Sequence, residues 1–492
     1  MKVRSRSLKA IILASGTLFS KLAGLLSAIF LARYLTKADY STYRQALLAY
    51  GTAAPFFALG LPKALYYFLP GEKKRPGGVF LENFLLLSVM GLLFTVGLWL
   101  GGADFLAWRF NNPDLSTALV VFAPFAFFML PQGTFTACMM GRDRVQHVAI
   151  FQPLSKLVMV AVVITVAVLW AGSMGAIVGA GLGAALIYVP TVWLMFHVCR
   201  GGSWKVSCTG IKKQLHYSIP LGVAAMVSTT AGNIDKLLVS SMGTPEQFAV
   251  YVNGAVQLPL VGIITGTVVS VLLPDMAKHY KAGEYAEAIA IWRRGAVKCG
   301  LILIPSGIFL AGVGQDFMAV LFGERYRESG IPFAFYAMLL PLSSVSFGSP
   351  LLAAGKTKLA LFECLGSLAI NFGLTVLAIK LFGIYGAAAA TLVTTYCWAA
   401  CFNTLFIKKY YHANLRQMFA YRELSIIAGA SLLASASFLL LLIPLDSSLL
   451  RLSLCGFSFF LVIALVYWRV GFVRPEQVRD FYLNKIKKGQ SK

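Results

Sequence analysis

Basic side chains interrupt several of the long apolar stretches of this sequence. The four positions are Lys21, Arg44, Lys156 and Lys236. A charged side chain at the centre of a bilayer costs at least about 2 kcal/mol, so such residues normally face a polar cavity or a partner. Because basic groups inside these stretches outnumber acidic ones, we expect them to handle an anion within the membrane.

Phosphate or pyrophosphate is the anion that these residue types predict. The planar guanidinium group of arginine can donate two parallel hydrogen bonds to a phosphate, whereas lysine acts as a point charge. The alternative for any single position is structural pairing with a carboxylate, for which Asp235, Glu82 and Glu363 are the candidates.

Two of the lysines lie near mid-depth of predicted helices. Thr17, Lys21, Gly24 and Ala28 follow three- and four-residue steps, which gives one helix face of small residues around a lysine. Lys156 lies about 12 residues, or ~18 Å, into its predicted span. Arg44 and Lys236 are expected nearer the outer face.

The composition predicts an all-α polytopic membrane protein. Hydrophobic residues make up 58% of the chain and charged residues only 13%. In hydrocarbon the backbone N–H and C=O groups must form hydrogen bonds within the protein, which only helices and closed barrels achieve. The sequence lacks the ~10-residue segments of alternating apolar and polar residues that are typical of barrel strands, so helices are expected. The net charge of +24 lies mostly in short connections and reflects membrane orientation, so nucleic acid is excluded as a partner.

Fourteen spans of about 20 apolar residues fit the sequence. They lie near 9–33, 40–62, 78–101, 116–140, 146–171, 174–198, 214–241, 247–273, 290–313, 331–354, 359–381, 383–407, 423–443 and 449–469. With these spans, 32 of the 43 lysines and arginines fall on one side, seven on the other and four inside. This asymmetry predicts that both termini are cytoplasmic.

The second half of the sequence repeats features of the first half after six predicted spans, which is an even number. Gly172 aligns with Gly383 at an offset of 211 positions, and Thr36 aligns with Thr244 at an offset of 208. We therefore predict two six-helix bundles related by a parallel pseudo-two-fold, which is a transporter architecture. The predicted divisions are residues 1–205 and 206–412 for the two lobes, 413–470 for two extra helices and 471–492 for a cytoplasmic tail.

Polar side chains in the second half are candidates for ion coupling or gating. They are Asp235, Glu363, Asn233 and Asn371, which could bind a proton or sodium ion. The alternative is hydrogen bonding between helices. In the first six spans Glu82 is the one acidic candidate, which argues against a cation-coupled antiporter.

Neither a reaction centre nor a metal site is predicted. The sequence contains no loop carboxylate pair, nucleophile motif or phosphate-cradling glycine loop with lysine, so we expect a non-enzyme without cofactors. Cys397 and Cys401 share a helix face, but no histidine joins them, and the cysteines are expected to be apolar fillers.

Three segments resemble the polysaccharide (O-antigen) flippases of the multidrug, oligosaccharidyl-lipid and polysaccharide exporter superfamily. They are Leu31–Tyr43, Gly60–Ala64, and Asn233–Val239 followed by Tyr251, and the resemblance covers roughly residues 8 to 411. It implies a flippase that moves a polyprenyl-pyrophosphate-linked oligosaccharide across the bacterial inner membrane by alternating access. Membrane lipids, and other membrane proteins of polysaccharide assembly, are the partners it implies.

By the same resemblance, Lys21, Arg44 and Lys156 hold the pyrophosphate, and Asp235 with Lys236 switches partners during closure. Two other classes remain open. One is a cation-coupled drug or ion antiporter of the same superfamily, and the other is a membrane polymerase or ligase of the same pathway.

Overall fold

The structure is a computed structural model that describes residues 6–170, 172–256, 258–442 and 448–472. Within these ranges the regular structure is helical throughout, with no strand. The prediction of an all-α chain is confirmed. The part of the predicted tail from residue 473 onward lies outside the described residues.

The chain forms two compact units. Unit 1 comprises Met1–Ile263 and Lys356–Phe402, and unit 2 comprises Ile264–Gly355 and Asn403–Lys492. The predicted lobes 1–205 and 206–412 stay a prediction.

The helices of unit 1 are α1 Arg6–Tyr34, α2 Lys37–Ala58, α3 Leu61–Phe68, α4 Pro76–Gly97, η1 Leu98–Gly102, α5 Ala103–Arg109, α6 Asp114–Phe122, α7 Pro124–Gln132, α8 Phe135–Gly141, α9 Val145–Leu169, α10 Ser173–Val198, α11 Cys208–Met242, α12 Pro245–Gly254, α19 Thr357–Phe382, α20 Tyr385–Val393 and η3 Thr394–Ala399. Helix α13, Pro259–Lys281, begins in unit 1 and continues in unit 2.

The helices of unit 2 are α14 Tyr285–Gly312, α15 Gly314–Phe322, η2 Glu324–Ser329, α16 Gly330–Ala337, α17 Leu339–Ser343, α18 Gly348–Ala353, α22 Leu415–Met418, α23 Tyr421–Ala434, η4 Ser435–Leu442 and α24 Ser448–Val470. Helix α21, Ala400–Tyr411, lies mostly in this unit.

Ten helices in the described part of the chain are long and apolar enough to cross a membrane. A further pair, Asp114–Phe122 with Pro124–Gly141, bends by 48° and makes eleven if it is one span. The chain is therefore a multi-pass membrane protein, but the predicted count of fourteen is not confirmed. Segments 40–62, 214–241 and 331–354 contain helices, yet the first two carry polar residues and the third is broken into short pieces.

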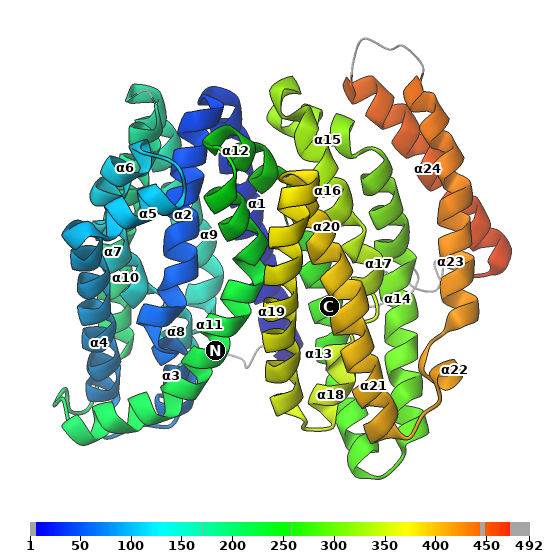
Figure 1. The fold of residues 1–492 in the computed structure, drawn as a ribbon. Coiled ribbons are helices and arrows are strands. Elements are labelled where there is room, and N and C mark those ends of the chain that lie inside the picture. Colours follow the sequence, from blue (N-terminus) through cyan, green and yellow to red (C-terminus); the bar gives the residue numbers. More distant parts are fainter. Residues whose placement is uncertain (1–5, 171, 257, 443–447, 473–492) are drawn as a thin grey trace, which may run out of the picture. The chain divides into compact units, whose positions relative to one another are not determined.

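Small residues allow the helices of unit 1 to approach closely. A Cβ at Gly179 of α10 would lie 2.9 Å from Val163 Cα of α9, and one at Gly91 of α4 would lie 2.8 Å from Phe127 Cα of α7. Packing of this kind drives helix association in lipid. It sets α4, α7 and α10 side by side (Figure 1) and lays α9 between α1 and α10.

Helix α11 is held by buried polar contacts near both of its ends. Near its start, Gln214 Nε2 donates to Glu82 Oε2 at 3.0 Å and Asn83 Nδ2 donates to Gln214 Oε1 at 2.9 Å. Near its other end, Gln45 Nε2 of α2 donates to Ser240 Oγ at 2.9 Å. All five side chains are at most 1% exposed. Such contacts fix the position of α11 against α4 and α2.

Residues that the repeat aligns occupy equivalent structural positions. Thr36 is the N-cap of α2 and Thr244 is the N-cap of α12, and each side-chain oxygen accepts a backbone N–H. Gly172 and Gly383 precede α10 and α20 with φ of 90° and 67°, a backbone region that favours glycine. The sequence offsets therefore mark real equivalences of local structure.

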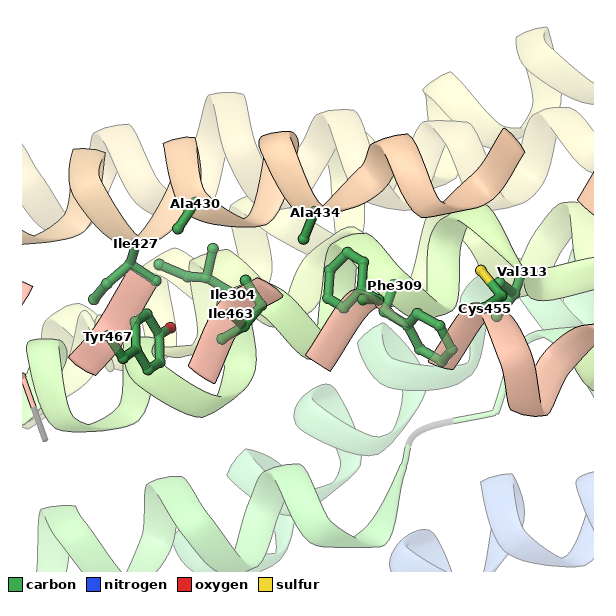
Figure 2. Packing of buried hydrophobic residues seen from close by; sticks show 10 residues of the cluster. Ile304, Phe309, Val313, Ile427, Ala430, Ala434, Cys455, Ile463 and Tyr467 are labelled. Atoms are coloured by element: carbon green, nitrogen blue, oxygen red, sulfur yellow. The ribbon is translucent and has the colours of Figure 1, made fainter. Parts of the chain in front are cut away.

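Unit 2 contains an apolar cluster that joins α14, α23 and α24. Figure 2 shows side chains of the three helices in this cluster, including Phe309, Ile427 and Cys455. Ile427 and Cys455 are fully buried. The predicted C-terminal helix pair thus packs on α14, and this cysteine serves as an apolar filler.

Unit 2 also contains a charged cluster around Asp316. Its Oδ1 accepts from Arg327 Nη1 at 3.0 Å and from Arg451 Nη2 at 3.3 Å. Arg327 Nε also contacts Glu324 Oε1 at 2.5 Å, and this hydrogen bond raises the pKa of Arg327. Both arginines therefore face carboxylates, which ties α24 to α15 and η2.

Candidate functional site

A cavity of about 740 Å³ lies among α1, α2, α7, α8, α9 and α10 of unit 1. It is lined by Thr17, Ser20, Lys21, Gly24, Tyr50, Met129, Gln132, Gly133, Phe135, Thr136, Phe151, Gln152, Ser155, Lys156, Met159, Ile187 and Thr191. We call it the lysine cavity. Its volume is within the range of sites that hold small organic ligands.

Helix α1 presents one face to the lysine cavity. Its lining residues Thr17, Ser20, Lys21 and Gly24 follow steps of three, one and three positions, the spacing of neighbours on one helix face. Ser20 Oγ donates to the backbone oxygen of Gly16 at 2.9 Å, so its donor is used within the helix. Lys21 extends from this face and is exposed to the cavity.

Helix α9 contributes lining residues with the same spacing. Gln152, Ser155, Lys156 and Met159 line the cavity with the same steps of three, one and three. Because α1 and α9 pack along each other, the two predicted lysines meet in one cavity although 135 positions separate them in the sequence.

The side chain of Lys156 reaches the face of α1 at Gly24. A Cβ at Gly24 would lie 3.3 Å from Lys156 Cε and 3.7 Å from Lys156 Nζ. Lys21 is three residues away from Gly24, which is about 4.5 Å of helix rise. The glycine thus leaves space for the ammonium group of Lys156 within about one helical turn of the Lys21 backbone.

Neutral polar groups surround the lysines. Gln152 Nε2 donates to Thr136 Oγ1 at 2.8 Å, and Gln132 Nε2 donates to the backbone oxygen of Ala184 at 3.2 Å. Ser155 Oγ is buried and has no hydrogen-bond partner. An unpaired buried hydroxyl costs free energy that a bound ligand could recover.

No carboxylate compensates the charge of the lysine cavity. Its lining contains neither Asp nor Glu, and in the described ranges no ion pair or hydrogen bond involves the side chain of Lys21 or Lys156. Lys156 is half-buried, so its charge is held partly out of solvent. Two cationic groups with hydroxyl and amide groups around them make this cavity a candidate site for an anion.

Arg44 lies outside the lining of the lysine cavity. Its Nη1 donates to Tyr40 Oη at 3.3 Å and its guanidinium carbon is 5.7 Å from the Tyr40 ring centre. Tyr40 Oη in turn donates to Asn253 Oδ1 of α12 at 2.7 Å. In this structure Arg44 therefore belongs to a polar contact between α2 and α12.

Lys236 is also separate from the lysine cavity. Its Nζ lies 3.8 Å from Asp235 Oδ1, and Tyr251 Oη donates to Asp235 Oδ2 at 2.7 Å. Asp235 is 2% exposed. The sequence left two interpretations of Lys236, anion binding and structural pairing with a carboxylate. The distance to Asp235 matches the pairing.

The other predicted coupling residues make local hydrogen bonds. Glu363 Oε1 accepts from Ser367 Oγ at 2.7 Å. Asn371 Nδ2 donates to Thr391 Oγ1 at 3.4 Å, and Asn233 Nδ2 donates to a backbone oxygen of its own helix. No cluster of three or more His, Cys, Asp or Glu side chains suited to a metal occurs among the residues that the structure describes.

Sequence reasoning missed several lining residues, among them Tyr50, Gln132, Gln152 and Ser155. One signal was available for two of them, because Gln152 and Ser155 share a helix face with Lys156. Tyr50 and Gln132 lie on other helices and carry no such signal.

The fold is that of a polytopic helical membrane protein, with a cavity inside a helical bundle whose charged lining residues are lysines. Residues 30–330 match the family described as polysaccharide biosynthesis protein. This match spans more than half of the chain, so the chain belongs to that family.

Individual relatives agree with this assignment. The probable lipid II flippase MurJ of Rhizobium meliloti (strain 1021) is 24% identical over 481 residues, which is 89% of each chain. A structure of lipid II flippase MurJ in the inward closed conformation matches with a TM-score of 0.75 and 14% identity, covering 94% of this chain and 99% of that one. An inward-facing multidrug resistance MATE transporter of the MOP superfamily matches with a TM-score of 0.61 and 13% identity, covering 82% and 99%. At such identities the structural matches establish a shared fold.

Proposed function

We propose that this protein is a flippase that moves a polyprenyl-pyrophosphate-linked oligosaccharide across a bacterial inner membrane by alternating access. The observation that carries the proposal is the pair Lys21 and Lys156 in one cavity whose lining has no carboxylate. A pyrophosphate has adjacent negative groups, and two lysines that line one cavity supply two positive charges to it.

The family supports this proposal. Its description is polysaccharide biosynthesis, and the relatives that match along most of the chain are named as a flippase and a transporter rather than as enzymes. In this mechanism the sugar occupies the polar part of the cavity and the polyprenyl tail stays in lipid. Export runs from the cytoplasmic to the periplasmic leaflet, with both termini in the cytoplasm.

A cation-coupled drug antiporter is disfavoured by the same observation. Cationic cargo needs negative charge in its site, whereas the charged lining residues here are lysines. The proposed ion coupling therefore rests on residues outside this cavity, with Asp235 and Glu363 as candidates.

The test is transport by the full-length protein in proteoliposomes. A fluorescent polyprenyl-pyrophosphate oligosaccharide is added, and a membrane-impermeant quencher reports how fast the label changes leaflet. We expect protein-dependent flipping that Lys21→Gln/Lys156→Gln reduces at least tenfold, whereas Lys380→Gln, at an exposed lysine of α19, changes it less than twofold. Equal flipping by the cavity variant and the unsubstituted protein would refute the role of the lysine cavity.

A further inference from the structure

A second basic cavity, of about 420 Å³, lies where α9 begins and α10 ends. Its charged and polar lining consists of Arg142, Arg144, His147, His197 and Arg200. It shares no lining residue with the lysine cavity. We call it the arginine cavity.

No carboxylate lines the arginine cavity. Arg142 donates to backbone oxygens, from Nε to Val198 at 3.4 Å and from Nη1 to Glu72 at 3.4 Å. The side chains of Arg144 and Arg200 take part in no hydrogen bond or ion pair in the described ranges. Three guanidinium groups are thus gathered around one space without a negative partner, which favours an anion there.

Two further features of the arginine cavity favour an anion. His147 Nδ1 is buried without a hydrogen-bond partner. The first turn of α9, which follows Arg144, adds backbone N–H groups and the positive end of a helix dipole. Guanidinium groups with helix N–H groups form a site for phosphate oxygens.

The helix faces that contain the two histidines continue as exposed apolar surface. On α9, Ile150 and Leu154 lie three and seven positions after His147 and are 71% and 53% exposed. On α10, Trp193 lies four positions before His197, stacks on it with ring centres 5.5 Å apart, and is 60% exposed. Tryptophan at the end of a span is typical of the membrane interface.

We propose that the arginine cavity binds the phosphate headgroup of an anionic membrane phospholipid, whose acyl chains lie along the exposed apolar faces of α9 and α10. The basic cavity supplies the charge complement, and the apolar strip beside it distinguishes a lipid from a free anion. Basic cavities between membrane helices commonly hold anionic headgroups. This inference is independent of the proposed transport function.

The test is lipid binding to the delipidated full-length protein, measured by native mass spectrometry. We expect phosphatidylglycerol to bind at least fivefold more tightly than phosphatidylcholine, and Arg144→Gln/Arg200→Gln to remove most of that preference. The matched control Arg416→Gln/Arg422→Gln changes two exposed arginines elsewhere and keeps the preference. Equal losses in both variants, or no loss in the first, would overturn the proposal.

Additional variants separate this site from its alternatives. Arg144→Lys/Arg200→Lys keeps the charge and is expected to keep more than half of the preference, which also controls for folding. Lys21→Gln/Lys156→Gln should bind phosphatidylglycerol normally, and a loss there would assign the headgroup to the lysine cavity instead. Water-soluble glycerol phosphate at the same concentration should not compete, and full competition would overturn the assignment to a lipid.

Discussion

The lysine cavity of unit 1 and the Asp316 cluster of unit 2 differ in how their positive charges are balanced. Arg327 and Arg451 face the Asp316 carboxylate at 3.0 and 3.3 Å, whereas no acidic residue lines the cavity that contains Lys21 and Lys156. Paired charges inside a fold maintain its packing. Unpaired charges impose a cost on the fold, and binding of an anion removes that cost. We expect this difference to separate a structural cluster from the proposed binding site.

The largest effect is expected from removing the cavity charges one at a time. Lys21→Gln and Lys156→Gln should each slow flipping at least fivefold, because each leaves one ammonium to hold a doubly charged group. Lys21→Arg should retain more activity than Lys21→Gln because it keeps the charge. The proteoliposome assay measures these flipping rates. Full activity of both single variants would contradict the proposal that the lysine cavity binds the pyrophosphate.

Breaking the Asp316 cluster is expected to affect stability rather than transport. Asp316→Asn leaves two partly buried arginines without their shared carboxylate and should lower the free energy of unfolding by about 2 kcal/mol, a value reduced for partial exposure. Thermal unfolding in detergent measures the loss. Lys156→Gln is the matched comparison and should not lower the unfolding temperature, because it removes a charge that no carboxylate balances.

A smaller effect is expected from narrowing the lysine cavity. Gly24→Ala places a methyl group 3.3 Å from Lys156 Cε, which displaces a flexible side chain by a few tenths of an ångström. We expect flipping to fall about threefold, with unchanged expression. Gly51→Ala on α2 is the control, because nothing lies within 4 Å of its added carbon. Equal rates for the two variants would place the ammonium of Lys156 away from Gly24.

The smallest effect concerns a carboxylate that backbone groups stabilise. Hydrogen bonds from the backbone N–H groups of Arg75 and Lys74 lower the pKa of Glu72, which lies in the loop between α3 and α4. Its stabilising contribution is therefore complete above its ordinary pKa and is lost as pH falls through the lower folded value.

Hydrogen exchange tests this pH dependence. Protection of the two amides should be constant from neutral pH down to the ordinary carboxyl range and should decrease below it. Glu72→Gln should remove that decrease, and a decrease that persists in the variant would exclude Glu72 as its cause.

Hydropathy and helix periodicity predicted the fold class and the membrane location. The exact span count could not be predicted, because segments such as 331–354 have span-like composition but form short broken helices. Pro332, Pro341 and Pro350 lie in this segment, and each lacks a backbone N–H, so the helical hydrogen bonds are interrupted while the segment stays apolar.

The candidate site was predictable in part. Lys21 and Lys156 stood out because charge is rare at their depth, and the structure brings them together. Arg44 and Lys236 carry the same signal in sequence but contact Tyr40 and Asp235 in the structure. Which of several buried cations share a cavity depends on helix packing, since their spacing along the chain does not specify their neighbours in space.

The buried hydrogen bonds near both ends of α11 restrict how this helix can move. Gln214 attaches one end to α4 and Ser240 attaches the other to α2, while Pro220 between them removes one backbone hydrogen bond of the helix. Because the two attachments lie on opposite sides of this proline, the loss of one of them loosens one segment of α11 and leaves the other segment held.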